Sequence, residues 1–390
     1  MSRPGRPPRK EFLVFGAPLI EEPEVAEVLA TLKSGWLGTG PRVHAFERQF
    51  ASYEGVPDAA ALNSCTAALH LSLLALDLKP GDEVVTTPMT FCATVNTILH
   101  AGATPVLADV DPRTQNIDPS AVADAVTSRT KAILPVHFAG RACDMDGIMK
   151  VAGAEGLAVV EDCAHAIETT YKGRKAGTFG DFGCFSFYAT KNVATGEGGM
   201  AIAKDPDRLA RLRILGLHGM SRDAWKRFTS SGYKHYQVVE YGFKYNMMDL
   251  QAAIGIHQLA RVEQNWGKRE RLWHLYDRHL EGSGLELPAP PEADTKHAYH
   301  LYTVMVDEAK VGVSRDAFLE SMAQKKIGVG VHYQSVPEHP VYQERLGWDP
   351  KGWPEAQRLG QQTVSLPLSP KMTEDDVLDV VAAVDATLRR

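Results

Sequence analysis

The chain has 390 residues, 44% of them hydrophobic, and a formal net charge of −6 at pH 7. This size and composition allow a large hydrophobic core and favour two domains over one. The negative charge argues against general nucleic-acid binding, and no apolar run in the sequence is long enough to cross a membrane.

Residues 1–11 are basic and proline-rich and lack the apolar stretch of a signal peptide. We expect them to form a mobile arm, with a contact to a partner subunit as the alternative. The five cysteines show no metal-ligand or redox spacing, so we expect small buried thiols in a cytoplasmic protein.

The spacing of apolar residues predicts a helix over 22–34, which a glycine-rich loop containing Trp36 then ends. A short apolar strand (59–63) is followed by Ser64, Cys65 and Thr66 and by an apolar helix over 67–78. Backbone N–H groups at such a strand-to-helix junction suit a phosphate, although Ser and Thr also commonly cap helices.

The next strand (83–87) leads through Phe91 into a helix over 92–100. An aromatic ring at this place can stack on a flat ligand, although phenylalanine is often simply buried in the core. Further strands are expected over 105–110 and 131–138, with a helix over 120–128 between them. His137 fits a buried structural histidine, and we assign it no catalytic role.

Asp162 follows an apolar strand over 157–161, and His165 comes three residues later. A carboxylate among apolar neighbours is costly unless it meets a cation, so Asp162 is a candidate ligand-binding group. The alternative is a carboxylate that caps the following helix.

The segment 185–200, F-S-F-Y-A-T-K-N-V-A-T-G-E-G-G-M, is the most informative in the chain. It predicts a strand, then Lys191, a glycine-rich turn and a second strand from Met200 to Ala203. Most lysines are solvated, but one at a strand exit can reach the edge where α/β sheets bind ligands. A desolvated amine of this kind becomes a nucleophile. Ser186 lies five residues before it.

Strands alternate with helices up to about residue 161, which predicts a mostly parallel, doubly wound sheet. Helical patterns continue over 248–259 and on to about 280, and a Pro- and Gly-rich linker covers 282–295. Strands over 300–306 and 327–331, the second ending in His332 and Tyr333, and a helix over 373–388 predict a smaller α+β domain. The expected division is an arm (1–11), a large domain (12–260) and a small C-terminal domain with its connecting helix (261–390).

Taken together, the lysine segment, the strand end E-D-C-A-H (161–165) and the junction S-C-T-A-A-L (64–69) resemble the DegT/DnrJ/StrS aminotransferases, which act on nucleotide-linked sugars. The resemblance extends from about Pro18 to the end of the chain. It implies an aspartate-aminotransferase-type fold that binds pyridoxal 5'-phosphate (PLP). It also implies a homodimer with shared active sites, and L-glutamate as amino donor.

The resemblance implies roles for individual residues. Lys191 would bind PLP as a Schiff base and move protons, with Asp162 on the ring nitrogen, His165 near the ring oxygen and Phe91 stacked on the ring. The phosphate would be bound by Cys65, Thr66, Ser186 and the partner subunit's Lys244. The sugar side would be formed by Trp36, His332 and Tyr333.

Two departures from the family pattern affect these assignments. Cys65 stands where glycine or alanine is frequent, and the family's G-Y-N-Y-R-M segment has Phe243, Lys244 and Asn246 at three positions. Enzymes that aminate C4 of UDP-4-keto-arabinose and related sugars have a similar segment with lysine and asparagine. They also have a run similar to the one from His218-Gly219 to Asp223-Ala224-Trp225 in this chain. Lys244 could equally be an ordinary solvated lysine.

The expected function is therefore transfer of the glutamate amino group to the C4 keto group of a UDP-4-keto-pentose or of a UDP- or dTDP-4-keto-6-deoxyhexose. The alternatives are amination at C3 and, in another class, a PLP-fold sensor or scaffold without activity. A related sugar dehydratase would carry histidine in place of Lys191.

Overall fold

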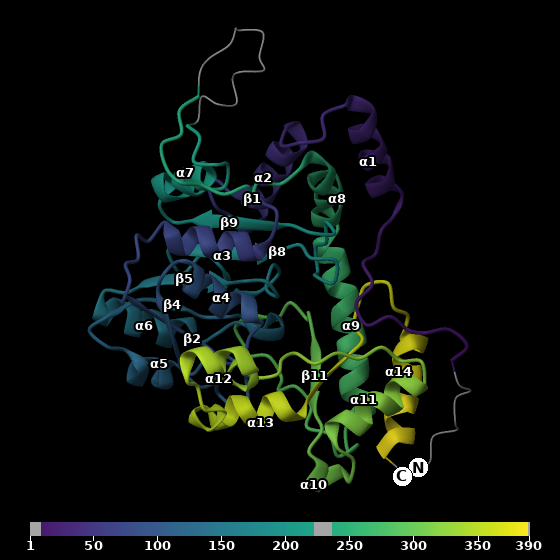
Figure 1. Ribbon diagram of the computed structural model, residues 1–390. Helices are drawn as coiled ribbons and strands as arrows, with labels where there is room; N and C mark the ends of the chain where they lie inside the picture. The colour runs from purple at the N-terminus through teal and green to yellow at the C-terminus, as the bar shows by residue number, and fades with distance from the viewer. Residues whose placement is uncertain (1–8, 222–235, 389–390) are drawn as a thin grey trace.

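The computed structural model describes residues 9–221 and 236–388 (Figure 1). Its centre is a seven-stranded sheet in the order β1-β9-β8-β5-β4-β2-β3. The strands are β1 (Ala60–Leu62), β2 (Glu83–Thr86), β3 (Thr104–Leu107), β4 (Thr130–Leu134), β5 (Ala158–Asp162), β8 (Phe182–Ser186) and β9 (Gly199–Ala203). In this sheet β9 runs antiparallel to β1 and β8, whereas β8, β5, β4, β2 and β3 are parallel. The predicted α/β fold with a mostly parallel sheet is confirmed.

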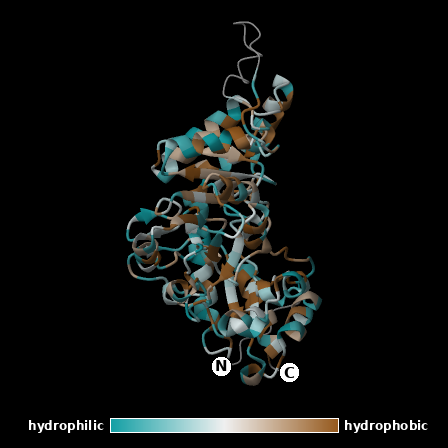
Figure 2. Ribbon diagram, turned by 60° about the vertical axis from the view of Figure 1, so that its left-hand side comes forward, coloured by the Kyte–Doolittle hydropathy of each residue, from teal (hydrophilic) through white to brown (hydrophobic). Residues whose placement is uncertain are grey.

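Helices cover both faces of this sheet because successive strand residues point to opposite sides. Val84 and Val160 pack toward α3 (Cys65–Leu74) and α7 (Pro206–Leu215), whereas Val85 and Val159 pack toward α5 (Pro119–Ala125) and α6 (Met145–Glu155). The strands are accordingly mostly hydrophobic, while the covering helices show both colours (Figure 2). A third cluster joins the β8–β9 end of the sheet to α2 (Pro41–Glu54) and α8 (Asp249–Ala260).

The C-terminal part surrounds a second core on α9 (Val262–Leu280). Its two-stranded antiparallel sheet consists of β11 (Tyr302–Met305) and β12 (Thr363–Leu366). Around this sheet lie α10 (Glu308–Val311), α11 (Arg315–Gln324) and α14 (Glu374–Leu388) (Figure 1).

The expected strand over 327–331 is wrong, and β12 was not predicted. Ile327 and Gly330 form only isolated bridges, to Leu13 and Ser365. Gly328 lies directly against the N-terminal segment, and a Cβ there would come within 2.8 Å of the Leu13 carbonyl oxygen. The glycines therefore allow the chain start to pass close by, and they do not support a regular strand.

The division of the chain into domains stays a prediction. Helices α12 (Pro340–Leu346) and α13 (Pro354–Gln362) belong to the predicted small domain but pack toward the edge of the large sheet. Trp353 Nε1 donates to the Leu107 carbonyl of β3 at 2.9 Å. Residues 1–8 of the expected arm lie outside the described residues, and Arg9 forms ion pairs with Asp376 and Asp379 of α14.

Three short strands and the first helix of the chain lie outside these groups. The sheet β10-β6-β7 consists of Thr295–Lys296, Thr170–Tyr171 and Arg174–Lys175, and α1 is Glu22–Ser34, as predicted. Over residues 9–221 and 236–388, no helix combines the length and the apolar character needed to span a membrane.

Candidate active site

A cavity of about 510 Å³ lies where the parallel strands end. Nine of the predicted site residues line it: Cys65, Thr66, Phe91, Asp162, His165, Ser186, Lys191, His332 and Tyr333. They come from segments far apart in the sequence, which the strand order brings to one edge of the sheet.

Lys191 follows β8 in a tight loop, where its backbone N–H donates to the Tyr188 carbonyl at 2.8 Å. Burial lowers the pKa of Lys191 to about 8, and the neighbouring Cys65 and Asp162 oppose this shift. An amine with this pKa is partly neutral near pH 8 and can act as a nucleophile and as a proton carrier.

Asp162 is the last residue of β5, and its side chain is 4% exposed. One carboxylate oxygen accepts from the Ala164 N–H at 3.0 Å, the other from the Thr94 hydroxyl at 2.9 Å. Burial raises the pKa of Asp162, against these two hydrogen bonds and the charge of Lys191. Its neutral donors leave room for one cationic N–H from a ligand, which would hold the carboxylate in its ionised form.

The first turn of α3 points into the same cavity. Ser64 caps the helix by accepting from the Ala67 N–H at 3.1 Å, while the N–H groups of Cys65 and Thr66 have no acceptor within the helix. A Cβ on Gly199 would come within 2.3 Å of the Ser64 carbonyl carbon, so only glycine lets β9 begin against this turn. These donors and the exposed Thr66 hydroxyl form a cradle for a phosphate.

His165 and Tyr333 both line the cavity and form a hydrogen bond, with 3.1 Å between Nε2 and the phenol oxygen. The Ala139 N–H donates to His165 Nδ1 at 3.2 Å, so the proton of the neutral ring is on Nε2 and donates to Tyr333. Burial lowers the pKa of His165 and raises that of Tyr333, which leaves both neutral. The Tyr333 hydroxyl proton is then available to a bound molecule.

The mouth of the cavity is aromatic. Phe91 is 57% exposed, and its ring centroid is 5.9 Å from that of Tyr333. His332 stacks on Phe15 at 5.3 Å, and burial lowers the pKa of His332 to about 4. The sequence did not indicate Phe15, because nothing in the pattern ties residue 15 to residue 332.

Thr94 was also missed, although a local signal existed. It follows Phe91 by three residues on α4 (Cys92–His100), and residues three apart share a helix face. The predicted aromatic side chain could therefore have indicated a partner for Asp162 one turn later.

Trp36 and Lys244 do not line the cavity of their own chain. Lys244 is exposed, and Trp36 is 48% exposed with Nε1 donating to the Thr39 carbonyl at 3.0 Å. Their roles at a partner's site stay predictions. Ser186 accepts from the Tyr188 N–H at 3.4 Å, which leaves its hydroxyl proton free to donate.

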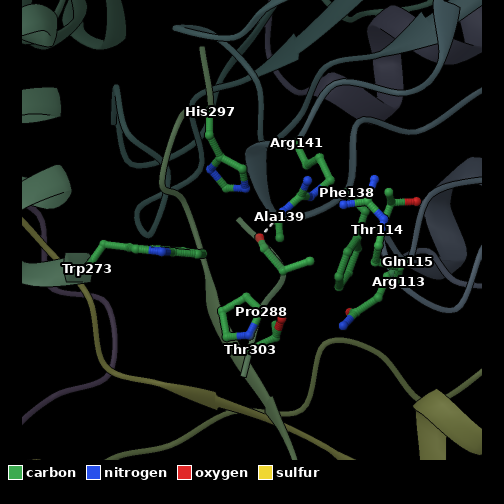
Figure 3. Close-up of a pocket in the computed structure, with 11 residues that line it drawn as sticks. Arg113, Thr114, Gln115, Phe138, Ala139, Arg141, Trp273, Pro288, His297 and Thr303 are labelled. Atoms are coloured by element: carbon green, nitrogen blue, oxygen red, sulfur yellow. Dashed lines mark hydrogen bonds between the residues drawn. The ribbon is translucent and has the colours of Figure 1, made fainter. Parts of the chain in front are cut away.

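Two other places in the structure resemble sites but bind nothing by their own chemistry. His137, Glu161 and Cys163 are close enough to hold a metal ion, but Glu161 already accepts from His137 Nε2 and from three backbone N–H groups. A cavity of about 20 Å³ beside Phe138 and Arg141 has room for about one water molecule (Figure 3). There the Arg141 guanidinium is neutralised by Glu292, so we assign no substrate to it.

The residues of the larger cavity fit PLP: a nucleophilic lysine, a buried carboxylate for a ring nitrogen, a phosphate cradle and an aromatic face. This set defines a PLP-dependent enzyme.

The comparisons identify the family. Residues 18–385 match the model of the DegT/DnrJ/EryC1/StrS aminotransferase family. The chain is 49% identical over 378 residues to the spore coat polysaccharide biosynthesis protein SpsC of Bacillus subtilis, covering 96% of this chain and 97% of SpsC.

Solved structures agree with this match. The PLP form of the putative sugar aminotransferase Spr1654 from Streptococcus pneumoniae superposes with a TM-score of 0.89 at 33% identity, covering 97% of this chain and 99% of that one. DesI, in a structure with its TDP-sugar product, gives 0.87 at 32% identity, covering 98% and 95%. The chain belongs to this family and is a PLP-dependent nucleotide-sugar aminotransferase.

Proposed function

We propose that this aminotransferase moves the amino group of L-glutamate to the C4 keto group of a UDP- or dTDP-linked 4-keto sugar. The observation that carries the proposal is the meeting of Lys191, Asp162 and Ser186 in one cavity with the N-terminus of α3. PLP supplies an electron-accepting ring that stabilises negative charge at the carbon bound to nitrogen.

Each residue of the cavity has a separate role in this proposal. Lys191 Nζ would take the proton from the donor's α-carbon as general base and would give it, as general acid, to the aldehyde carbon of PLP. Asp162 holds a ring nitrogen in its protonated form, and the α3 N-terminus with Ser186 binds the phosphate. Tyr333, kept neutral, can donate its hydroxyl proton to an oxygen of a molecule bound in the cavity.

The C4 position is supported by sequence and local structure. The His218 N–H donates to the Phe243 carbonyl at 2.8 Å, which places the His218-Gly219 run beside the Phe243–Asn246 segment that resembles C4-aminating enzymes. The rest of that run, from Arg222 to Trp225, lies outside the described residues. DesI, solved with a TDP-sugar product, supports a nucleotide-linked substrate.

A homodimer is part of the proposal. Val25, Leu29 and Leu32 follow one face of α1 and are 45%, 49% and 50% exposed. Trp36, just after this helix, is also 48% exposed, and an exposed apolar surface fits a second copy of the chain. Free cysteines, four of the five buried, support a reducing compartment such as the cytoplasm.

The test is turnover with glutamate of a panel containing UDP-4-keto-pentose and UDP- or dTDP-4-keto-6-deoxyhexose, with wild type and Lys191→Ala side by side. Nitrogen at C4 of the product, absent with the variant, supports both class and position. If wild type binds PLP but aminates none of these, 3-keto sugars are tested next. Turnover of those alone would replace C4 by C3.

A further inference from the structure

A chain of buried polar side chains runs behind the cavity and ends at His165. Glu168, Asn192 and His300 are 0%, 5% and 4% exposed, and none of them lines the cavity. We propose that these three residues position the active site: Glu168 fixes the amide of Asn192, which holds the backbone beside Lys191 and sets the tautomer of His300, against which His165 stacks.

The first step is the orientation of the Asn192 amide. Its nitrogen lies 3.0 and 2.9 Å from the two Glu168 carboxylate oxygens and 2.9 Å from the Ala298 carbonyl oxygen. All three are acceptors, so this atom must be the NH₂ group. The amide oxygen then faces His300 Nδ1 at 2.9 Å, and His300 must carry its proton on Nδ1.

The second step links His300 to His165. Their ring centroids are 4.4 Å apart with planes 36° from parallel. The backbone of Ala139 links the same two residues, since its carbonyl accepts from the backbone N–H of His300 at 3.2 Å and its N–H donates to His165 Nδ1. His165 is thereby fixed with its proton on Nε2, toward Tyr333.

The third step concerns Lys191. Hydrogen bonds to three residues hold the Asn192 side chain, and the Lys191 backbone N–H donates to the Tyr188 carbonyl. The backbone of Lys191 is thus held at its own N–H and at the next residue, Asn192, by contacts that do not involve the side-chain amine. A displacement of about 1 Å at a reacting group can cost about 10²-fold in rate, so this support has a measurable value.

Two substitutions would disturb this set of hydrogen bonds. Glu168→Gln keeps the size of the side chain but adds a donor beside Asn192. The Asn192 amide is then oriented by the Ala298 carbonyl and by the one oxygen that remains at position 168, so its hold on His300 Nδ1 is weaker. Asn192→Leu removes all the hydrogen bonds at once while filling similar space.

The test measures both variants, loaded with PLP, for kcat, for KM of glutamate and for the absorption spectrum of the cofactor. Glu24→Gln is the control, since Glu24 is 1% exposed, accepts from the Gln258 amide at 2.7 Å, is also paired with Arg261 and does not line the cavity. We expect kcat to fall about tenfold or more in the two variants with KM within about twofold and a shifted spectrum. The control should lose thermal stability only.

A second measurement does not depend on variants or on PLP. Nitrogen-15 NMR of histidine-labelled apoprotein reports which ring nitrogen carries the proton. We expect Nδ1–H for His300 and Nε2–H for His165 in wild type. The opposite tautomer at either residue would overturn the assignment.

The variants have their own contradicting outcome. If Glu168→Gln and Asn192→Leu lose as much stability as Glu24→Gln but keep the wild-type kcat and spectrum, the positioning role is overturned.

Discussion

The hydroxyl of Thr94 donates to the carboxylate of Asp162 at 2.9 Å inside the protein, where burial raises the pKa of that carboxyl. A donor at this place favours the ionised form. We expect Thr94→Val to raise the pKa of Asp162 further and to weaken its hold on a ring nitrogen. A hydrogen bond to a charged group contributes about 1.5–3 kcal/mol, so PLP affinity and kcat should each fall about tenfold.

Thr97→Val is the matched control. Thr97 lies one turn further along α4, is equally buried and donates to the Thr94 carbonyl at 3.0 Å. It should leave PLP affinity unchanged when both variants are titrated with PLP and followed by absorbance. Equal losses in the two variants would show that helix α4, and not the Asp162 contact, is responsible.

The lowered pKa of Lys191 gives a pH prediction. With a pKa of about 8, roughly half of the amine is neutral at pH 8, against well under 1% for a lysine of ordinary pKa. The rate at which apoenzyme captures PLP covalently should therefore rise with pH and level off above about 8 to 9. Stopped-flow absorbance measures this rate. A rise that continues to pH 10 would mean that the amine is hydrated as in free lysine.

The sequence predicted the sheet well, because its strands are short apolar runs separated by helices and turns. β2, β5 and helix α4 begin and end within about a residue of the expected bounds. The C-terminal part was harder, since β12 pairs with β11 across about sixty residues and has no local signal of its own. Gly328 and Gly330 were predicted as strand residues because the local sequence pattern gives no sign of the N-terminal segment that packs against Gly328.

In the site too, residues with a local sequence signal could be predicted, and contacts between distant segments could not. Asp162 could be predicted to lie at the sheet edge because it ends an apolar strand, and Lys191 because its segment resembles the lysine segment of the family. The stacking of Phe15 on His332 could not, because it joins the start of the chain to a segment more than three hundred residues later. The same holds for the partners of Asn192, which depend on how 298–300 pack beside the lysine loop.

Lys244 provides a test of shared active sites. It is exposed and does not line the cavity of its own chain, as expected if it serves the partner's cofactor. When each variant is assayed alone, Lys191→Ala should have no aminotransferase activity and Lys244→Ala should have reduced activity. In a mixed dimer one site combines the intact Lys191 of one subunit with the intact Lys244 of the other.

Co-refolding equal amounts of the two variants should therefore restore activity, up to about a quarter of the wild-type value for random pairing. The readout is amino-sugar formation before and after mixing, and Lys191→Ala refolded alone is the control. Absence of any gain in a sample shown to contain mixed dimers would place Lys244 in the site of its own chain, or outside both.

Glu54 gives a stability prediction away from the site. It ends α2, is 3% exposed, and neither carboxylate oxygen has a hydrogen-bond partner among the described residues. Lys175 Nζ is 3.9 Å away, but it donates to the Ile167 carbonyl and lies over the Tyr53 ring. Burial raises the pKa of Glu54 to about 8. The negative end of the helix opposes ionisation further.

A carboxyl whose pKa is raised on folding stabilises the fold below its unfolded pKa, and this contribution is lost as pH rises through the folded value. Wild type should thus lose stability between about pH 5 and pH 9. Glu54→Gln should match wild type near pH 5 and exceed it near pH 9 by on the order of 1–3 kcal/mol. Urea unfolding of both proteins at the two pH values measures this. A difference that is the same at pH 5 and pH 9 would show that Glu54 does not titrate in this range.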